Sequence, residues 1–218
     1  MKLIESLKMD DYKQTKNVPI NKGHFDLDTK DRKKSFSKKL STGWEDGYLT
    51  YRSDWEALPK QQKIREYPLL LDLELSSKCN LSCPMCYTIT DEFKSKVTKG
   101  YMDTPLFKKI IDEVNGQVPA IRLSYRGEPT LHKDFIDCVR YAKSAGIKEV
   151  STLTHGKKLQ GLFLKELITA GIDWITISVD GMGETYDMIR YPLKWTDTLA
   201  RLKEIKDLKK KLGKQKPV

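Results

Sequence analysis

The sequence predicts an α/β protein built on a parallel β-sheet, because short apolar segments alternate with amphipathic helical patterns from residue 69 onward. A strand that leads through a helix to the next strand forms a parallel pair with a right-handed crossover. We expect strands at 69–76, 120–125, 148–154 and 174–179. We expect helices near 105–115, 133–146, 159–170 and 196–212. The resulting order, βαβαβαβα, predicts one sheet with four βα units.

The strands carry polar residues at alternating positions, which is unusual for a parallel sheet covered on both faces. Asp72 and Glu74 alternate with leucines in the first strand, and Arg122 lies between two apolar residues of the second. A sheet that curves around a polar lumen, with helices outside, accounts for this pattern better than a flat sheet between two helix layers. We therefore expect these three side chains to face the lumen, where Arg122 neutralises a carboxylate.

The helices have recognisable ends. Pro105 stands where a first helical turn tolerates proline, and Gly116, Gly146 and Gly171 follow the first three helices, as glycine commonly does at a helix end. The last helix has an apolar stripe flanked by lysines, which predicts an amphipathic surface helix with solvated lysines rather than a patch for nucleic acid or lipid. The stripe consists of Leu199, Leu202, Ile205, Leu208 and Leu212.

The first 68 residues differ in composition from the rest of the chain, and we treat them as a separate region. Residues 1–40 contain many lysines and few large apolar side chains, so we expect a poorly ordered basic arm. Residues 43–55 are richer in aromatics and are expected to pack onto the body as a lead-in segment. We assign residues 69–218 to the core domain.

Composition places the chain among globular proteins, with 39% apolar and 32% charged residues. The net charge of +10 raises the possibility of a nucleic-acid partner, but residues 69–200 hold 17 basic and 17 acidic side chains. The excess lies at the ends, and aromatics do not interleave with basic runs, so nucleic-acid binding is not expected. The sequence has neither an 18-residue apolar stretch nor the apolar region of a signal peptide, so we expect a cytoplasmic protein without a membrane span.

Three of the four cysteines, Cys79, Cys83 and Cys86, lie directly after the first predicted strand. Such crowding in a cytoplasmic chain is typical of a metal site. Three thiolates on a short loop can hold one corner of an iron–sulfur cube and leave the fourth iron open to a ligand. The alternative is a zinc site with a fourth ligand from Cys138, His132 or His155, although a second cysteine or histidine pair is missing. The fourth cysteine, Cys138, is isolated in the sequence, and we interpret it as an inert thiol buried in the core.

The spacing Cys79-x-x-x-Cys83-x-x-Cys86 after a strand resembles the motif of radical S-adenosylmethionine (SAM) enzymes. Further motifs fall at the ends of the next three strands, as they do in that family. The second strand ends in Tyr125-Arg126-Gly127-Glu128-Pro129, which is similar to the family's Gly-Gly-Glu-Pro. The third ends in Thr154-His155-Gly156, where relatives often have Thr-Asn-Gly, and the fourth ends in Ser178-Val179-Asp180-Gly181. The resemblance covers residues 69–218.

The resemblance implies a partial (β/α)6 barrel with its chemistry at the carboxyl ends of the strands. It also implies a [4Fe–4S] cluster whose open iron chelates SAM. An electron from a flavodoxin- or ferredoxin-like donor then cleaves the sulfonium, giving methionine and a 5′-deoxyadenosyl radical that abstracts hydrogen from a substrate. Relatives with a similar cysteine loop modify peptides or oxidise alcohols and sugars, so these substrate classes are slightly favoured.

Roles transfer from the family by matching position. Cys79, Cys83 and Cys86 would ligate the cluster. The turn Gly127-Glu128 would receive the SAM ammonium group, with the Glu128 carboxylate as acceptor. Other cofactor contacts are expected from Met85 against the adenine, and from Ser178 and Asp180 at the ribose or substrate. Without the family, Ser178 and Asp180 would simply cap a strand-to-helix turn.

The chain departs from the family pattern at three of these positions. Met85 stands where an aromatic residue often covers the adenine, and methionine offers a less defined surface. Arg126 replaces the first glycine of Gly-Gly-Glu-Pro and so departs from the close backbone approach to SAM that a glycine there permits, although Gly127 remains. His155 replaces the usual asparagine and is either structural or within reach of SAM or substrate.

Only four of the six βα units of such a barrel are recognisable, and residues 213–218 look like the approach to a fifth strand. We therefore expect a fragment, a natural truncation, or a core that a partner completes. Relatives often add SPASM or twitch extensions with auxiliary clusters, which the single remaining Cys138 does not support. A non-catalytic iron–sulfur binding or sensing protein is the alternative function.

Overall fold

The computed structural model describes residues 29–218 and contains the predicted parallel sheet. Its strands follow one another in space as they do in sequence, with all three neighbouring pairs parallel. The strands are β1 (Leu70–Asp72), β2 (Ala120–Arg122), β3 (Glu149–Thr154) and β4 (Trp174–Ile177). The register places Leu71 beside Ile121 and Ile121 beside Val150. The predicted order and direction of the strands are confirmed.

The first two strands are shorter than the sequence predicts. After Asp72 the chain leaves the ladder and hydrogen-bonds to the segment before the next helix: Leu75 O accepts from Met102 N at 3.0 Å, and Ser77 N donates to Gly100 O at 3.1 Å. Ser76 forms an isolated antiparallel bridge with Tyr101. Because these backbone groups are paired with residues 100–102, they cannot extend β1 along β2.

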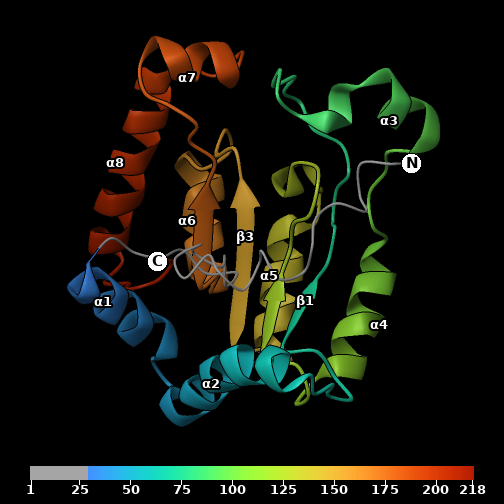
Figure 1. Ribbon diagram of the computed structural model, residues 1–218. Coiled ribbons are helices and arrows are strands. Elements are labelled where there is room, and N and C mark those ends of the chain that lie inside the picture. The colour runs from blue at the N-terminus through green and yellow to red at the C-terminus, as the bar shows by residue number, and fades with distance from the viewer. Residues whose placement is uncertain (1–28) are drawn as a thin grey trace, which may run out of the picture.

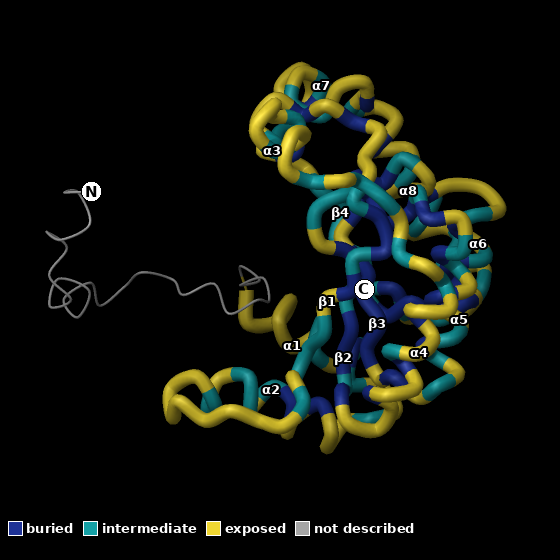
Figure 2. The backbone as a smooth tube through the Cα atoms, turned by 90° about the vertical axis from the view of Figure 1, so that its right-hand side faces the viewer, coloured by how far each residue is buried: buried dark blue, intermediate teal, exposed yellow. Residues whose placement is uncertain are grey.

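Four helices cover one face of the sheet, and Figure 2 shows them together on one side of the strands. They are α4 (Thr104–Val114), α5 (Phe135–Ser144), α6 (Gly161–Ala170) and α8 (Trp195–Lys211). Gly116, Gly146 and Gly171 follow helix ends with φ of 76°, 95° and 91°, as predicted. The main core joins sheet residues such as Ile121 to helix residues such as Phe107.

The opposite face of the sheet carries the polar side chains, as predicted for the lumen. Leu73 and Leu75 belong to the helix-covered core, so the intervening strand positions point the other way. The Arg122 guanidinium donates from Nε and Nη2 to the two oxygens of Asp72, at 2.8 and 2.6 Å. Arg126 pairs with Glu74 in a similar manner. Two ion pairs among the described residues therefore lie on this face, one at the ends of β1 and β2 and one just beyond them.

Helices α1 (Lys30–Ser41) and α2 (Glu45–Gln61) lie across the amino ends of the strands (Figure 1). The expected packing of the aromatic segment is confirmed, because Tyr48 and Tyr51 form a buried cluster with Leu40 and Ala120. The expectation of a poorly ordered arm is wrong for residues 30–40, where the Thr29 hydroxyl caps α1 by accepting from Arg32 N. The rest of that expectation falls on residues 1–28, outside the described residues.

The carboxyl ends of the strands are surrounded by short elements that the sequence pattern does not predict. These are α3 (Asp91–Lys96), α7 (Glu184–Ile189) and the 3-10 turns η2 (Tyr87–Ile89) and η3 (Pro129–Leu131). Figure 1 shows α3 and α7 at the end of the sheet opposite α1 and α2. Each spans six residues or fewer, which is too short to show a helical period.

Only part of the apolar stripe predicted for helix α8 packs against the core. Ile205, Leu208 and Leu212 pack against the core, whereas Leu199 and Leu202 are exposed. Beyond it, Val218 N donates to Asp173 O at 2.9 Å and Val218 O accepts from Ile175 N at 3.2 Å, which is a parallel pairing along the outer edge of β4. Within residues 29–218, no helix has the length and apolarity needed to cross a membrane.

Candidate functional site

The predicted site residues gather at a cavity of about 270 Å³ that also touches the ends of β3 and β4. Its walls come from the cysteine loop, the turn after β2, the turn after β3, and the end of β4. The sequence-predicted residues on the walls are Cys79, Cys83, Met85, Cys86, Gly127, Glu128 and Ser178. The parallel strands bring these separate segments to one edge of the sheet, as the sequence analysis expects.

The cysteine loop presents its three thiols to this cavity at different depths. Cys83 is buried, Cys86 is half-buried, and Cys79 is exposed. Cys86 N donates to Cys83 O at 2.9 Å, which folds the loop so that both side chains reach the same cavity. Although Cys79 as a residue is exposed, partial desolvation of its thiol raises the pKa of that thiol, and a hydrogen bond with the Leu81 backbone opposes the rise. Cation or metal binding would favour the thiolates.

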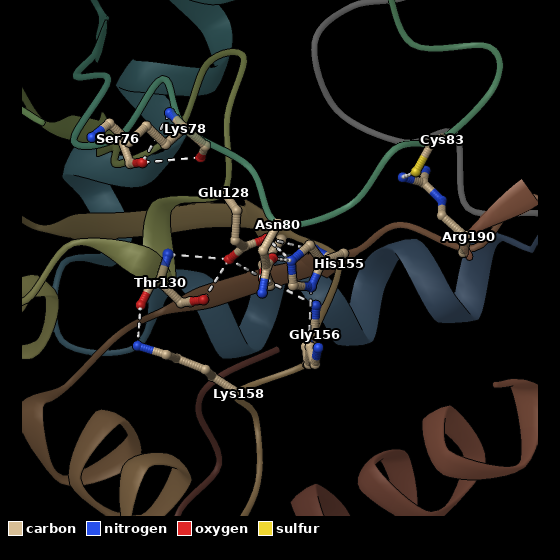
Figure 3. A network of polar contacts seen from close by, with 12 residues as sticks. Ser76, Lys78, Asn80, Cys83, Glu128, Thr130, His155, Gly156, Lys158 and Arg190 are labelled. Carbon is tan, nitrogen blue, oxygen red and sulfur yellow. Dashed lines mark hydrogen bonds and ion pairs between the residues drawn. The ribbon is translucent and has the colours of Figure 1, made fainter. Parts of the chain in front are cut away.

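Arg190 also lines the cavity, and sequence reasoning missed it. Its Nη1 lies 3.7 Å from Cys83 Sγ, and Figure 3 shows its guanidinium directed at that sulfur. The same guanidinium forms an ion pair with Asp180, the one predicted site residue that does not line the cavity. Arg190 follows the unpredicted helix α7, 107 residues from Cys83, so no local pattern marks it.

The turn after β2 packs directly on the approach to the cysteine loop. A Cβ at Gly127 would lie 2.3 Å from Ser76 O and 2.7 Å from Lys78 O, so no other residue fits there without moving the backbone. Glu128 N donates to Lys78 O at 2.8 Å. The turn is therefore fixed to the residue that immediately precedes Cys79.

Glu128 is the centre of the hydrogen-bond network drawn in Figure 3. The residue is only 1% exposed. Oε1 accepts from the Thr130 hydroxyl at 2.5 Å, from Thr130 N at 3.1 Å and from the Thr154 hydroxyl at 2.7 Å. Oε2 accepts from His155 N at 3.0 Å. The carboxylate thus binds the turn after β2 to the turn after β3; its expected contact with a SAM ammonium group stays a prediction.

His155 links this network to the cysteine loop. Its Nδ1 accepts from Lys157 N at 3.1 Å, which leaves the ring proton on Nε2, where the partner is Asn80 Oδ1 at 2.8 Å. Burial lowers the pKa of His155, although the nearby Glu128 carboxylate opposes that change. The ring therefore lies between Asn80 of the cysteine loop and Glu128, whose Oε2 is 3.3 Å from His155 Nε2.

The three side chains considered as a fourth zinc ligand all have other surroundings. His155 uses both ring nitrogens as just described. His132 does so too, with Nε2 2.8 Å from Met102 O and Nδ1 accepting from Asp134 N. Cys138 lies in the core on α5, where burial raises its pKa to about 12, as expected for an inert thiol. These contacts weaken the zinc interpretation.

Comparison with curated proteins identifies several relatives. The chain is 32% identical over 151 residues to the tungsten-containing aldehyde ferredoxin oxidoreductase cofactor-modifying protein of Pyrococcus furiosus, covering 67% of this chain and 41% of that protein. It is 32% identical over 141 residues to the AdoMet-dependent heme synthase of Methanosarcina barkeri, covering 64% and 39%. The chain thus spans about two fifths of the length of these relatives.

Solved structures share the fold. SuiB of Streptococcus suis, bound to the precursor peptide SuiA, matches 75% of this chain and 36% of that chain with a TM-score of 0.56 and 14% identity. The enzyme anSMEcpe with bound AdoMet matches 66% and 42%, with a TM-score of 0.50 and 23% identity. These neighbours confirm a partial barrel of four βα units here.

A family model agrees with the cysteine spacing, the strand-end motifs and the fold. The model of the radical SAM superfamily matches residues 73–213, which include every residue of the cavity. Members of this family act on SAM through an iron–sulfur cluster, and the relatives just described are named as synthases or modifying proteins. This chain therefore belongs to the radical SAM superfamily.

Proposed function

We propose that Cys79, Cys83 and Cys86 hold a [4Fe–4S] cluster and that the adjoining cavity binds SAM, so that this region carries the radical-generating centre of an enzyme. The observation that carries the proposal is the meeting of all three thiols with the Gly127-Glu128 turn at one cavity. A cluster site needs soft sulfur ligands and an access route for the cofactor, and this cavity offers both.

The arrangement of the thiols fits a cluster better than a single ion. Across residues 29–218, no three His, Cys, Asp or Glu side chains come close enough together to hold one metal ion. A cube of iron and sulfide places each cysteine on a different iron atom, so its ligands are spread around a cavity rather than gathered at a point. Gly127 also fits a cofactor site. Because it has no side chain, the backbone of the turn after β2 can lie directly against residues 76–78, which lead into the cysteine loop.

When bound, the cluster and SAM together supply a 5′-deoxyadenosyl radical after one electron enters from a reductant, for which we propose a flavodoxin- or ferredoxin-like donor. The protein's part is to bind and orient. The turn Gly127-Glu128 receives the ammonium end of SAM, Met85 covers the adenine, and Ser178 contacts the ribose. Arg190 donates toward Cys83 and holds Asp180 at the rim of the cavity.

The reaction proposed is hydrogen abstraction from an organic substrate. Relatives include a heme synthase and a cofactor-modifying protein, and the SuiB structure contains a precursor peptide. The activities named for these relatives differ and do not select one substrate. We therefore propose, as the first classes to test, those that the cysteine-loop resemblance favours: peptides, alcohols and sugars. Arg126, Ser178 and Arg190 place hydrogen-bonding groups on the cavity walls, which suits a substrate with such groups.

Cluster-dependent cleavage of SAM tests the proposal. Protein reconstituted anaerobically with iron and sulfide is mixed with SAM and dithionite, and methionine and 5′-deoxyadenosine are measured by chromatography. We expect both products in equal amounts, and neither from the Cys83→Ala variant. A protein that holds a full cluster but yields no products would instead be the non-catalytic iron–sulfur protein.

A further inference from the structure

Arg126 and Glu74 connect the segment that follows β1 to the cofactor-binding turn, and the family's glycine at position 126 could not make this connection. The Glu74 carboxylate accepts three hydrogen bonds from one residue. Oε1 accepts from Arg126 N at 3.0 Å and from its Nε at 3.1 Å, and Oε2 accepts from Nη2 at 2.6 Å. The two side chains are 29% and 19% exposed, so water screens the pair only in part.

Arg126 connects this ion pair to the cysteine loop through the two residues that follow it in the chain. Arg126 is followed by Gly127, which is wedged against Ser76 and Lys78, and by Glu128, whose amide donates to Lys78 O. The side chain also lies over Phe93 of α3, with Cζ 5.8 Å from the ring centroid. The Glu74 carboxylate, two residues beyond the end of β1, therefore fixes the first residue of the turn, and the turn contacts Lys78, the residue before Cys79.

The pair also compensates a charge at the cavity. Arg126 lines the cavity, and SAM carries a net positive charge because its sulfonium and ammonium groups outnumber its one carboxylate, so an unpaired guanidinium there would disfavour SAM. Resting on the function proposed above, we propose that Glu74 and Arg126 are positioning residues: their ion pair holds the turn Arg126–Glu128 in the conformation that accepts SAM and neutralises the arginine that replaces the family's glycine.

The sheet supplies a matched control on the same face. Asp72 and Arg122 form a similar two-bond ion pair two residues earlier in the chain than Glu74, with distances of 2.8 and 2.6 Å. That pair involves only side chains, whereas Glu74 also binds the backbone amide of the turn. Asp72→Asn therefore removes the same charge from the same strand without releasing the turn.

Hydrogen exchange tests the positioning without any cofactor. In the full chain without cluster, we expect Glu74→Gln to speed amide exchange in a peptide covering 124–130 about tenfold or more, because it weakens charge-assisted bonds to Arg126. Peptides covering the helix α5 and strand β3 should exchange as in the wild type. Asp72→Asn should leave 124–130 unchanged. Equal exchange in the Glu74→Gln variant and the wild type would overturn the proposal.

SAM titration of the reduced, reconstituted protein tests the link to the cofactor. Followed by electron paramagnetic resonance, half-conversion of the cluster signal should require about tenfold more SAM in Glu74→Gln, with iron content per chain unchanged. Arg126→Gln removes the guanidinium and keeps the bond from the residue-126 amide to Glu74, so it should require less additional SAM than Glu74→Gln. The double variant should be no weaker than the weaker single variant, since both remove one interaction. A drop in iron content with an unchanged response per cluster would make the pair merely structural. A wild-type cluster indifferent to SAM would refute the proposed function, while the exchange result would stand independently.

Discussion

Replacing Glu149 with glutamine should make the stability of the protein less dependent on pH. Glu149 begins β3 at the amino end of the sheet and is 1% exposed. Neither of its carboxyl oxygens has a hydrogen-bond partner among the described residues. Burial, with a smaller contribution from Asp173, raises its pKa from 4.5 to about 7, although Arg52, Lys216 and Lys143 oppose the rise.

The sign and size of the effect follow from that pKa. Between about pH 4.5 and 7 the folded protein holds a proton that the unfolded chain has released, so this group's contribution to stability falls as pH rises through that window. A shift of about 2.5 pKa units corresponds to about 3 kcal/mol. The wild type should therefore lose about 3 kcal/mol relative to Glu149→Gln between pH 4 and pH 8.

Urea unfolding at pH 4, 6 and 8, followed by far-ultraviolet circular dichroism, measures the difference between the two proteins. Taking the difference cancels the contribution of other groups that titrate in this range. Glu113→Gln, on the exposed side of α4, is the matched control and should show no such trend. A difference between wild type and Glu149→Gln that is constant with pH would refute the reasoning.

Three further predictions concern the site itself. Cys83→Ala should abolish the brown colour of the reconstituted protein, read as the loss of visible absorbance, whereas full absorbance would contradict the ligand assignment. Gly127→Ala should weaken SAM binding more than tenfold by forcing the turn away from Ser76, while Gly100→Ala, where a Cβ meets nothing within 4 Å, should bind SAM normally in the same titration. Glu128→Gln should lower the free energy of unfolding by about 2–4 kcal/mol, because an amide group cannot accept all the hydrogen bonds that end on the buried carboxylate; a change below about 0.5 kcal/mol in urea unfolding would contradict the role of Glu128 as the hub.

Sequence periodicity was sufficient to predict the sheet, because each strand is followed by a helix long enough to show an apolar face. The helices α4 and α5 begin and end within about two residues of the predicted limits. The short helix α7 shows no period, and so Arg190 at its end could not be assigned to the site. Helix α1 was missed because it packs through Leu40, its one fully buried residue, and the partly buried Phe36, which are too few to show an apolar period.

The residues of the candidate site could be predicted from the sequence, but most of their contacts could not. Spacing within the chain indicates the three cysteines, and the motifs at the strand ends indicate Gly127 and Glu128. The partners of these residues are distant in sequence: Thr154 is 26 residues from Glu128, and Asn80 is 75 residues from His155. Only the folded arrangement reveals that Glu128 is engaged on both oxygens, or that Arg126 is compensated by Glu74.

The central claim is that the three cysteines and the adjoining cavity form one cofactor site. Electron paramagnetic resonance of the anaerobically reconstituted and reduced protein, recorded with and without SAM, tests it most directly. The account predicts a [4Fe–4S]⁺ signal whose g-values shift when SAM is added, since SAM binds the iron that no cysteine holds. A cluster signal that stays the same at saturating SAM would contradict it.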